Sequence, residues 1–221
     1  MKILNLYANI GGNRKFWDGH DITAVEIDPK IAAIYQDLWP DDTVVVGDAH
    51  QYLLDHFHEF DFIWSSPPCP THSKMNKMNG LNPYKENKGQ IENGGGIPVR
   101  YPDMQLYQEI ILLTEWFRGK WCIENVVSYY EPLIQPVQFG SHYFWTNFYF
   151  PTNGFEKIEG GRGIGGHTNP TIQELAEMKG FDLSRLKGKG IDIRLALRDV
   201  TEPELGKYIL DWALKDDLVL F

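Results

Sequence analysis

Short apolar runs alternate with helix-forming segments through the first 65 residues, and no other feature limits the possible folds of this chain as strongly. Asp28 followed by Pro29 predicts the start of a helix that continues to Leu38, and a second helix is predicted over Ala49–Phe57. Runs rich in β-branched and aromatic residues predict strands at Ile3–Tyr7, Ile22–Ile27, Thr43–Val46 and Phe60–Ser65. Such alternation predicts an α/β fold with a mostly parallel sheet and helices on both faces.

The rest of the chain predicts more helices and an antiparallel pair of strands. Three further helices are predicted, over Pro102–Phe117, Pro170–Lys179 and Pro203–Leu214. A further strand and a hairpin are predicted, at Trp121–Glu124 and at Ile134–Phe139 with Tyr143–Phe150. Between Thr152 and Lys189 the composition shifts to glycine, lysine and polar residues. This shift predicts a small insertion at 152–189 in a main unit formed by residues 1–151 and 190–221.

The charge of the chain gives two opposing indications about its partners. A formal net charge of −9 argues against nucleic acid. However, the segments from Lys74 to Arg100 and from Arg185 to Arg198 each carry a local excess of cations. Because electrostatic fields fade over about 10 Å at 0.1 M salt, a polyanion responds to such a patch more than to the total charge. Two solvated loops would give the same pattern, so charge alone leaves both interpretations open.

Hydropathy and cysteine content limit the class of protein further. The sequence contains no run of about 18 apolar residues, and its first residues enter a predicted strand directly. We therefore expect neither a membrane span nor a signal peptide. Cys69 and Cys122 cannot form a zinc site by themselves, so we expect no metal and no disulfide framework. A reducing cytoplasm is the simplest setting for such a chain.

A thiol and a carboxyl group follow two of the predicted strands. The segment Ser65–Pro70 reads Ser-Ser-Pro-Pro-Cys-Pro and places Cys69 just beyond the carboxyl end of a buried strand. Open α/β sheets bind ligands at that edge. The strand at Trp121–Glu124 brings Glu124 to the same edge, and the two groups together suggest covalent catalysis assisted by protonation. Cys122, inside that strand, is interpreted as a small core residue.

Acidic residues end the second and third predicted strands. Glu26 is placed to accept both hydroxyls of a ribose, and Asp48 to accept from an adenine amino group. The first strand runs into Leu6–Gly12, whose small residues let the backbone approach a ligand. A helix N-cap explains each acid equally well when it is taken alone. Three consecutive strand ends suited to one nucleoside favour a nucleoside site.

In this order the motifs resemble those of the cytosine-C5 methyltransferases that depend on S-adenosylmethionine. Leu6–Gly12 resembles the family's first motif, Ser66–Cys69 the motif that carries the nucleophile, and Ile123–Val126 its Glu-Asn-Val motif. Ser141–Asn147 is similar to a segment of the de novo-type DNA methyltransferases, and Glu202–Gly206 resembles the closing motif. Pro-Pro-Cys followed by Glu-Asn-Val is a specific combination.

The resemblance implies a Rossmann-like class I methyltransferase fold with a mostly parallel seven-stranded sheet, in which 152–189 is a small target-recognition region. It implies that Cys69 attacks C6 of a cytosine flipped out of double-stranded DNA, that protonated Glu124 binds ring N3, and that His142 helps to orient the base. The implied cofactor contacts are Tyr7, Ala8, Asn9, Ile10, Gly11, Gly12, Glu26, Ile27, Asp48, Ala49 and Pro67. The implied DNA contacts are Ser73, Lys74, Lys77, Arg100, Lys187 and Lys189.

The chain also departs from the family pattern. Asn5 and Asn9 replace an aspartate and a glycine of the first motif. The arginines of the eighth motif are missing, with Gly140 and His142 where they would fall, and His142 is the predicted substitute. A tRNA cytosine-C5 methyltransferase and an inactive cofactor-binding partner subunit therefore stay as alternatives. We further expect a role in restriction–modification, a possible homodimer, and a cytoplasmic protein or a viral protein acting in the host cytoplasm.

Overall fold

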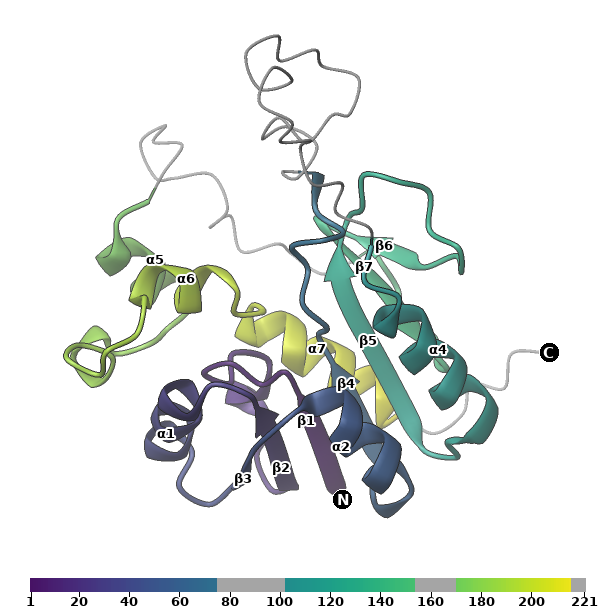
Figure 1. Ribbon diagram of the computed structural model, residues 1–221, viewed down its shortest axis with the longest axis horizontal. Coiled ribbons are helices and arrows are strands. Elements are labelled where there is room, and N and C mark those ends of the chain that lie inside the picture. Colours follow the sequence, from purple (N-terminus) through teal and green to yellow (C-terminus); the bar gives the residue numbers. More distant parts are fainter. Residues whose placement is uncertain (75–101, 154–169, 216–221) are drawn as a thin grey trace, which may run out of the picture.

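The computed structural model describes residues 1–74, 102–153 and 170–215, and these form a single twisted sheet covered by helices (Figure 1). The seven strands are β1 (Lys2–Leu6), β2 (Asp21–Glu26), β3 (Thr43–Val46), β4 (Phe62–Ser65), β5 (Lys120–Val126), β6 (Val137–Phe139) and β7 (His142–Thr146). Their order is β3-β2-β1-β4-β5-β7-β6. The pairs among β1 to β5 are parallel, and β7 runs antiparallel to both β5 and β6. This is the predicted class I methyltransferase fold.

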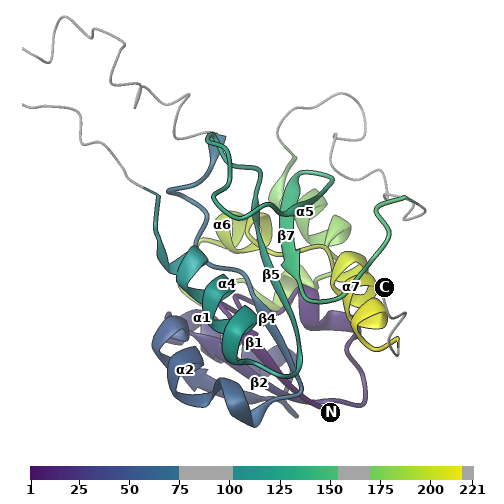
Figure 2. The same ribbon diagram turned by 90° about the vertical axis from the view of Figure 1, so that its right-hand side faces the viewer.

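Helices cover both faces of the sheet (Figure 2). They are α1 (Pro29–Leu38), α2 (Ala49–His56), α4 (Gln105–Trp116), α5 (Ile172–Met178), α6 (Ile193–Arg198) and α7 (Pro203–Ala213), with 3-10 turns η1 (Asn13–Phe16), η2 (Phe57–Glu59) and η4 (Leu183–Arg185). Alternating residues of β1 pack into two different parts of the core, one on each face of the sheet. Leu4 packs with α2 and α4, whereas Ile3 belongs to the cluster that contains Ile209 of α7. The helix α1 covers Ala24 of β2, on the same face as α7.

Local chemistry explains where most elements begin. Asp28 caps α1 as predicted, because its Oδ1 accepts from the backbone N–H groups of Lys30 (2.7 Å) and Ile31 (3.4 Å). The predicted hairpin strands are too long. Pro136 has no N–H to donate to a ladder, and β6 starts just after it. At the other end, the Asn147 side chain bonds to Gly119 and Trp121 and takes the chain away from β7.

Other predicted bounds also change, and the structure contains one further helix. The strand β5 extends beyond Glu124 to Val126, because its pairing with β7 continues to His142. The helix α4 begins at Gln105, where the carboxylate of Asp103 accepts the first free N–H (3.0 Å). The helix α6 was not predicted at all. It has six residues, too few for a helical period to be recognised, and is capped by Asp192.

The described part of the predicted insertion does not have a hydrophobic core of its own. Leu175, Phe181 and Leu186 lie in one buried cluster with Ile10 and Ile34 of the main unit. Lys179, itself buried, donates to the carbonyl of Val200 (2.8 Å) and to Glu202 (2.9 Å). The insertion is therefore packed firmly against the loop that follows β1. The proposed domain boundaries at 152 and 189 stay a prediction.

Candidate functional site

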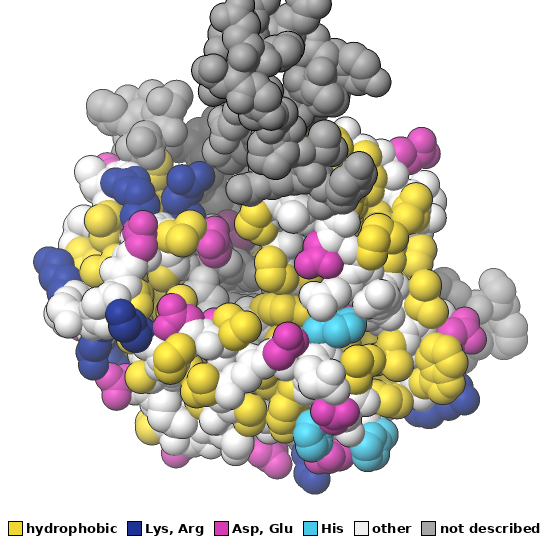
Figure 3. Space-filling view, in the orientation of Figure 1, with side chains coloured by type: hydrophobic (Ala, Val, Ile, Leu, Met, Phe, Trp, Pro, Cys, Tyr) yellow, Lys and Arg dark blue, Asp and Glu magenta, His cyan; other side chains and the backbone are white. Residues whose placement is uncertain are grey.

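The carboxyl ends of β1 to β5 meet at one edge of the sheet, and the residues predicted to act together lie there. The strand order changes direction between β1 and β4, which is the switch point where open α/β sheets leave a crevice. Figure 3 shows that the surface is hollowed between the part formed by α5 and α6 and the part formed by β6 and β7.

The loop after β1 contains two strained residues. Tyr7 has φ of 55° and Asn9 has φ of 47°, a left-handed conformation that costs a non-glycine residue about 1–3 kcal/mol. Two carboxylates hold these residues in place: the Tyr7 hydroxyl donates to Glu109 (2.6 Å), and the Asn9 backbone N–H donates to Glu26 (2.9 Å). The Asn9 side chain donates to the carbonyl of Ala196 (3.0 Å), while its Oδ1 is buried and accepts no hydrogen bond from the described residues.

The glycines of this loop make room for the chain itself. A Cβ on Gly11 would lie 2.4 Å from Nε1 of Trp39, and one on Gly12 would lie 1.9 Å from Cγ1 of Val200. Gly11 also has φ of 77°, which favours glycine. Packing within the protein therefore accounts for both glycines, whereas the sequence interpretation assigned them to the approach of a ligand. Ala8 and Ile10 are buried beside them.

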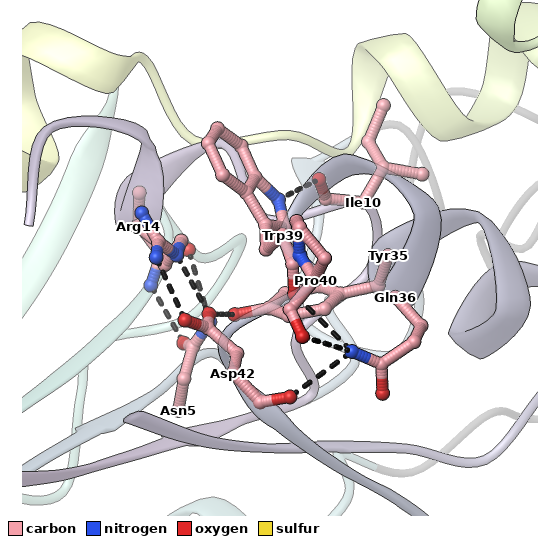
Figure 4. Close-up of polar contacts among 9 residues, drawn as sticks. Asn5, Ile10, Arg14, Tyr35, Gln36, Trp39, Pro40 and Asp42 are labelled. Carbon is pink, nitrogen blue, oxygen red and sulfur yellow. Dashed lines mark hydrogen bonds and ion pairs between the residues drawn. The ribbon is translucent and has the colours of Figure 1, made fainter. Parts of the chain in front are cut away.

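A network of polar side chains is bonded to the loop after β1 (Figure 4). Arg14 makes a bidentate ion pair with Asp42 (2.6 and 2.7 Å), and the Tyr35 hydroxyl donates to the same carboxylate (2.8 Å). The Trp39 indole, on which the Arg14 guanidinium stacks at 4.4 Å, donates to the carbonyl of Ile10 (3.1 Å). Asn5, which replaces the family's aspartate, is fully buried and accepts from the amide of Asn13 (2.7 Å).

The acids after β2 and β3 keep capacity for a ligand. Each oxygen of Glu26 accepts one backbone N–H, from Asn9 and from Asp28 (both 2.9 Å). Asp48 caps α2 through one oxygen, which accepts from Gln51 (3.0 Å). A carboxylate offers about four acceptor positions, so these bonds leave others open. Two apolar side chains stand exposed beside these acids: Ile27 is 70% exposed and Val46, at the end of β3, is 56% exposed.

Backbone contacts fix the loop that carries the thiol. The carbonyl of Cys69 accepts from the N–H groups of His72 and Ser73 (both 3.0 Å), which closes a tight turn. The buried amide of Asn125 donates to the carbonyl of Pro67 (2.9 Å). The His72 ring, also buried, bonds to the Tyr130 hydroxyl (2.6 Å). Cys69 itself is half-buried, while Cys122 is fully buried in β5 as predicted, and both thiols are free.

The carboxyl group of Glu124 lies at the end of β5, 8% exposed. Its Oε1 is 3.5 Å from Nε2 of His142 on the neighbouring strand β7. Burial raises the pKa of Glu124, and His142 and the Ser66 hydroxyl partly oppose this shift. Burial also raises the pKa of the Cys69 thiol, and the nearby charges of Asp199 and Glu124 raise it further. Both groups are thus biased towards their protonated, neutral forms.

The predicted DNA contacts are only partly placed together. Lys74 and Lys187 are exposed, and Ser73 forms an isolated bridge with Ser128. Lys189 is ion-paired with Asp37 of α1 (2.6 Å), and the Arg185 guanidinium bonds to the carbonyl of the same residue. This basic cluster therefore lies against α1. Lys77 and Arg100, with most of the predicted loop at 71–99, lie outside the described residues.

Several residues at this edge had no predicted role. Asn125 holds the Pro-Pro-Cys turn, and its position directly after Glu124 was a usable signal. The charge of Asp199 raises the pKa of the Cys69 thiol, although Asp199 lies in a distant part of the sequence. Glu109 is a polar residue inside the helix α4. Neither has a local pattern that marks it. Among the residues that the structure describes, no three His, Cys, Asp or Glu side chains are grouped to hold a metal ion, and no helix could cross a membrane.

The first part of the chain is similar to one known protein family. Residues 1–88 match the model of the family described as C-5 cytosine-specific DNA methylase. The match covers 88 of the 221 residues, less than half of the chain. The matched segment contains the loop after β1, Glu26, Asp48 and Cys69, and it ends before Glu124. No curated protein shows significant similarity to the chain.

Solved structures with a similar arrangement include methyltransferases of different kinds. A Spodoptera frugiperda DNMT2 variant shares 23% identity over 57% of this chain, with a TM-score of 0.36. The Entamoeba histolytica methyltransferase EhMeth shares 15% identity over 57%, with a TM-score of 0.34. The glycopeptide N-methyltransferase MtfA, in complex with S-adenosyl-L-homocysteine, shares 18% over 66%, with a TM-score of 0.33. The aligned parts cover 35%, 38% and 56% of those three chains, respectively.

Proposed function

We propose that this protein transfers a methyl group from S-adenosylmethionine to C5 of cytosine in double-stranded DNA, with Cys69 as the nucleophile and Glu124 as the acid. The observation that carries the proposal is the pairing of a half-buried thiol with a buried carboxyl group of raised pKa at neighbouring strand ends. Cytosine-C5 chemistry needs this pair, because C5 becomes nucleophilic only after a thiolate has added to C6.

The residues at the ends of β1, β2 and β3 fit S-adenosylmethionine. Glu26 would hold the ribose hydroxyls through its open acceptor positions, and Asp48 the adenine amino group. The exposed side chains of Ile27 and Val46 would cover the two faces of the adenine ring. The buried and unsatisfied Oδ1 of Asn9 fits a donor such as the amino group of the methionine tail. When bound, this cofactor supplies an electrophilic methyl group.

Cys69 and Glu124 would act on the cytosine ring together. The Cys69 sulfur forms a bond to C6, and the electron pair of the C5–C6 double bond moves to C5 and is delocalised onto N3. Protonated Glu124 donates to N3 and stabilises that charge, a role that requires the raised pKa. After C5 has been methylated, loss of the C5 proton and departure of Cys69 as a thiolate restore the double bond. Because the pKa of Cys69 is raised as well, the thiol must give its proton to solvent water as the base binds, and the resulting thiolate then adds to C6.

His142 supports Glu124 in this scheme. Its Nε2 lies 3.5 Å from the Glu124 carboxyl group and its side chain is 25% exposed, so the ring would border the target base. It would thereby contribute the orienting contact for which other family members use arginine. The base must leave the duplex to reach this pocket, at a cost of a few kcal/mol. Among the predicted DNA contacts that the structure describes, Lys74 and Lys187 are exposed and would bind phosphates, while Lys189 is already paired with Asp37.

Methyl transfer to defined nucleic acids tests the proposal. We expect labelled methyl groups from S-adenosylmethionine to appear as 5-methylcytosine in unmodified duplex DNA with the wild-type protein, and to be absent with Cys69→Ser. Cys122→Ala is the matched cysteine control and should retain transfer, because Cys122 is buried away from the surface. Label in tRNA instead of DNA would support a tRNA methyltransferase. No label in either, with the cofactor still bound, would support an inactive partner subunit and overturn the proposal.

A further inference from the structure

A fully buried carboxylate lies beneath the site and is not used in the reaction proposed above. Glu109, in the middle of α4, is 0% exposed and accepts three hydrogen bonds from side chains. Its Oε1 accepts from the Tyr7 hydroxyl (2.6 Å) and lies 3.1 Å from Nδ1 of His50, and its Oε2 accepts from the Ser65 hydroxyl (2.6 Å). The two hydroxyl contacts have the short distances typical of charge-assisted hydrogen bonds.

The three donors come from three different segments of the site. Tyr7 is the first residue after β1 and has the left-handed backbone conformation described above. Ser65 is the last residue of β4 and precedes the turn that carries Cys69. His50 is the second residue of α2, two positions after the cap Asp48. One side chain on α4 is therefore bonded to the cofactor side of the site and to the nucleophile side.

Packing alone does not explain a carboxylate at this position. Taking an ionised carboxyl group out of water is unfavourable unless its oxygens are fully hydrogen-bonded, and an apolar residue of similar size would fill the space without that cost. The neighbours Ile110 and Leu113 do fill the core in this way. Unlike an apolar side chain, the carboxylate forms directional hydrogen bonds. It fixes the Tyr7 phenol and the Ser65 hydroxyl relative to each other through two oxygens of one rigid group.

We propose that Glu109 is a positioning residue that couples the loop after β1 to the turn bearing Cys69, so that each loop holds its working geometry only when the other does. This inference rests on the proposed function, because it takes the first loop to bind the cofactor and Cys69 to be the nucleophile. The residue touches neither the reacting atoms nor the cofactor, and acts through Tyr7 and Ser65.

Two readouts separate this coupling from a simple contribution to stability, and neither needs methyl transfer. The first is the affinity for S-adenosylhomocysteine, measured by calorimetry. The second is the rate at which iodoacetamide alkylates Cys69, measured by peptide mass spectrometry, in which buried Cys122 serves as an unreactive reference. We expect Glu109→Gln to weaken binding and to change the alkylation rate, each about tenfold, since hydrogen bonds to charged groups are worth roughly that or more.

The decisive experiment is a double-mutant cycle between the two sides. Tyr7→Phe removes one hydroxyl on the cofactor side, yet coupling predicts that it also changes the alkylation rate of Cys69. That effect should disappear when Tyr7→Phe is introduced into Glu109→Gln, because the connection is already broken. Glu115→Gln, an exposed carboxylate on the same helix, is the matched control and should alter neither readout.

The outcomes distinguish the two proposals. If Tyr7→Phe leaves Cys69 alkylation unchanged, or if the two variants act additively, Glu109 only stabilises the fold and the coupling is wrong. If the wild type does not bind S-adenosylhomocysteine, the proposed function fails, while the alkylation cycle still decides whether Glu109 couples the loops. If Glu109→Gln unfolds, Ser65→Ala with Tyr7→Phe provides the same cycle with smaller perturbations.

Discussion

Gly12 offers a direct test of whether the glycines after β1 serve packing or a ligand. Its φ of −66° and ψ of −49° are ordinary for any residue, so alanine would bring no backbone strain at this position. The new methyl group would instead lie 1.9 Å from Cγ1 of Val200 and 2.5 Å from the carbonyl oxygen of Thr201. Both distances are far inside van der Waals contact, so Gly12→Ala must displace the segment between α6 and α7.

The loss of stability caused by Gly12→Ala depends on which of the contacting atoms can move. Val200 is a side chain that can rotate, and an off-rotamer position costs about 0.5–1.5 kcal/mol. The Thr201 carbonyl belongs to the backbone and can move only with its segment. Overpacking of a buried site costs typically about 1–3 kcal/mol, and with two contacts we expect a loss near 3 kcal/mol. Val200→Ala removes the first contact alone and should restore only part of the stability.

Urea unfolding without cofactor measures this loss, read from the midpoint at unchanged slope. Gly47→Ala is the matched control, because no heavy atom lies within 4 Å of its added Cβ. The control should be neutral or more stable by up to about 1 kcal/mol, through a less flexible unfolded chain. If Gly12→Ala unfolds at the wild-type midpoint while its affinity for S-adenosylhomocysteine falls, the glycine serves the ligand and the packing argument is wrong.

Two further predictions concern the charges of the site. Because burial raises the pKa of Glu124 in the folded state above its ordinary 4.5, the folded protein binds more protons there, so its stability relative to Glu124→Gln should fall as pH rises from about 4.5 through the raised pKa. The change is about 1.4 kcal/mol per pKa unit, measurable by urea unfolding at pH 4 and pH 8; a constant difference would contradict it. Asp199→Asn removes a charge that raises the pKa of Cys69, so the pH profile of thiol alkylation should move to lower pH, while Asp211→Asn on the exposed face of α7 should leave it in place.

Features fixed by neighbours in the sequence were predictable. Asp28 and Pro29 define the start of α1 through bonds within one turn, and the order of strands follows from their alternation with helices. Cys69 and Glu124 could be placed at one edge because parallel strands end on the same side. The ends of the hairpin depend on the Asn147 side chain, which bonds across to β5, and no local pattern reveals that contact.

The electrostatics of the site could not be predicted for the same reason. Burial and the charge of Asp199 raise the pKa of the Cys69 thiol, and neither cause is visible in the residues around Cys69. Asp199 is 130 positions away from Cys69 in the sequence, so no local pattern links its charge to the thiol. Glu109 likewise looks like any polar residue of an amphipathic helix until Tyr7 and Ser65 are seen to converge on it.

The turn that carries Cys69 is held from helix α4 and from the neighbouring strand β5, and this bears on how the reactivity of the thiol is controlled. On the α4 side, Ser65 is fixed by Glu109, and from β5 the Asn125 amide holds the carbonyl of Pro67. The backbone around Cys69 is therefore set before any substrate arrives, whereas burial biases both the thiol and the Glu124 carboxyl group towards neutral forms. In the proposed reaction, a Cys69 thiol that keeps its proton until the base binds would be protected from premature alkylation or oxidation, because only a thiolate reacts readily. When the base enters and accepts a hydrogen bond from Glu124, ionisation of Cys69 would lead to addition of its sulfur to C6.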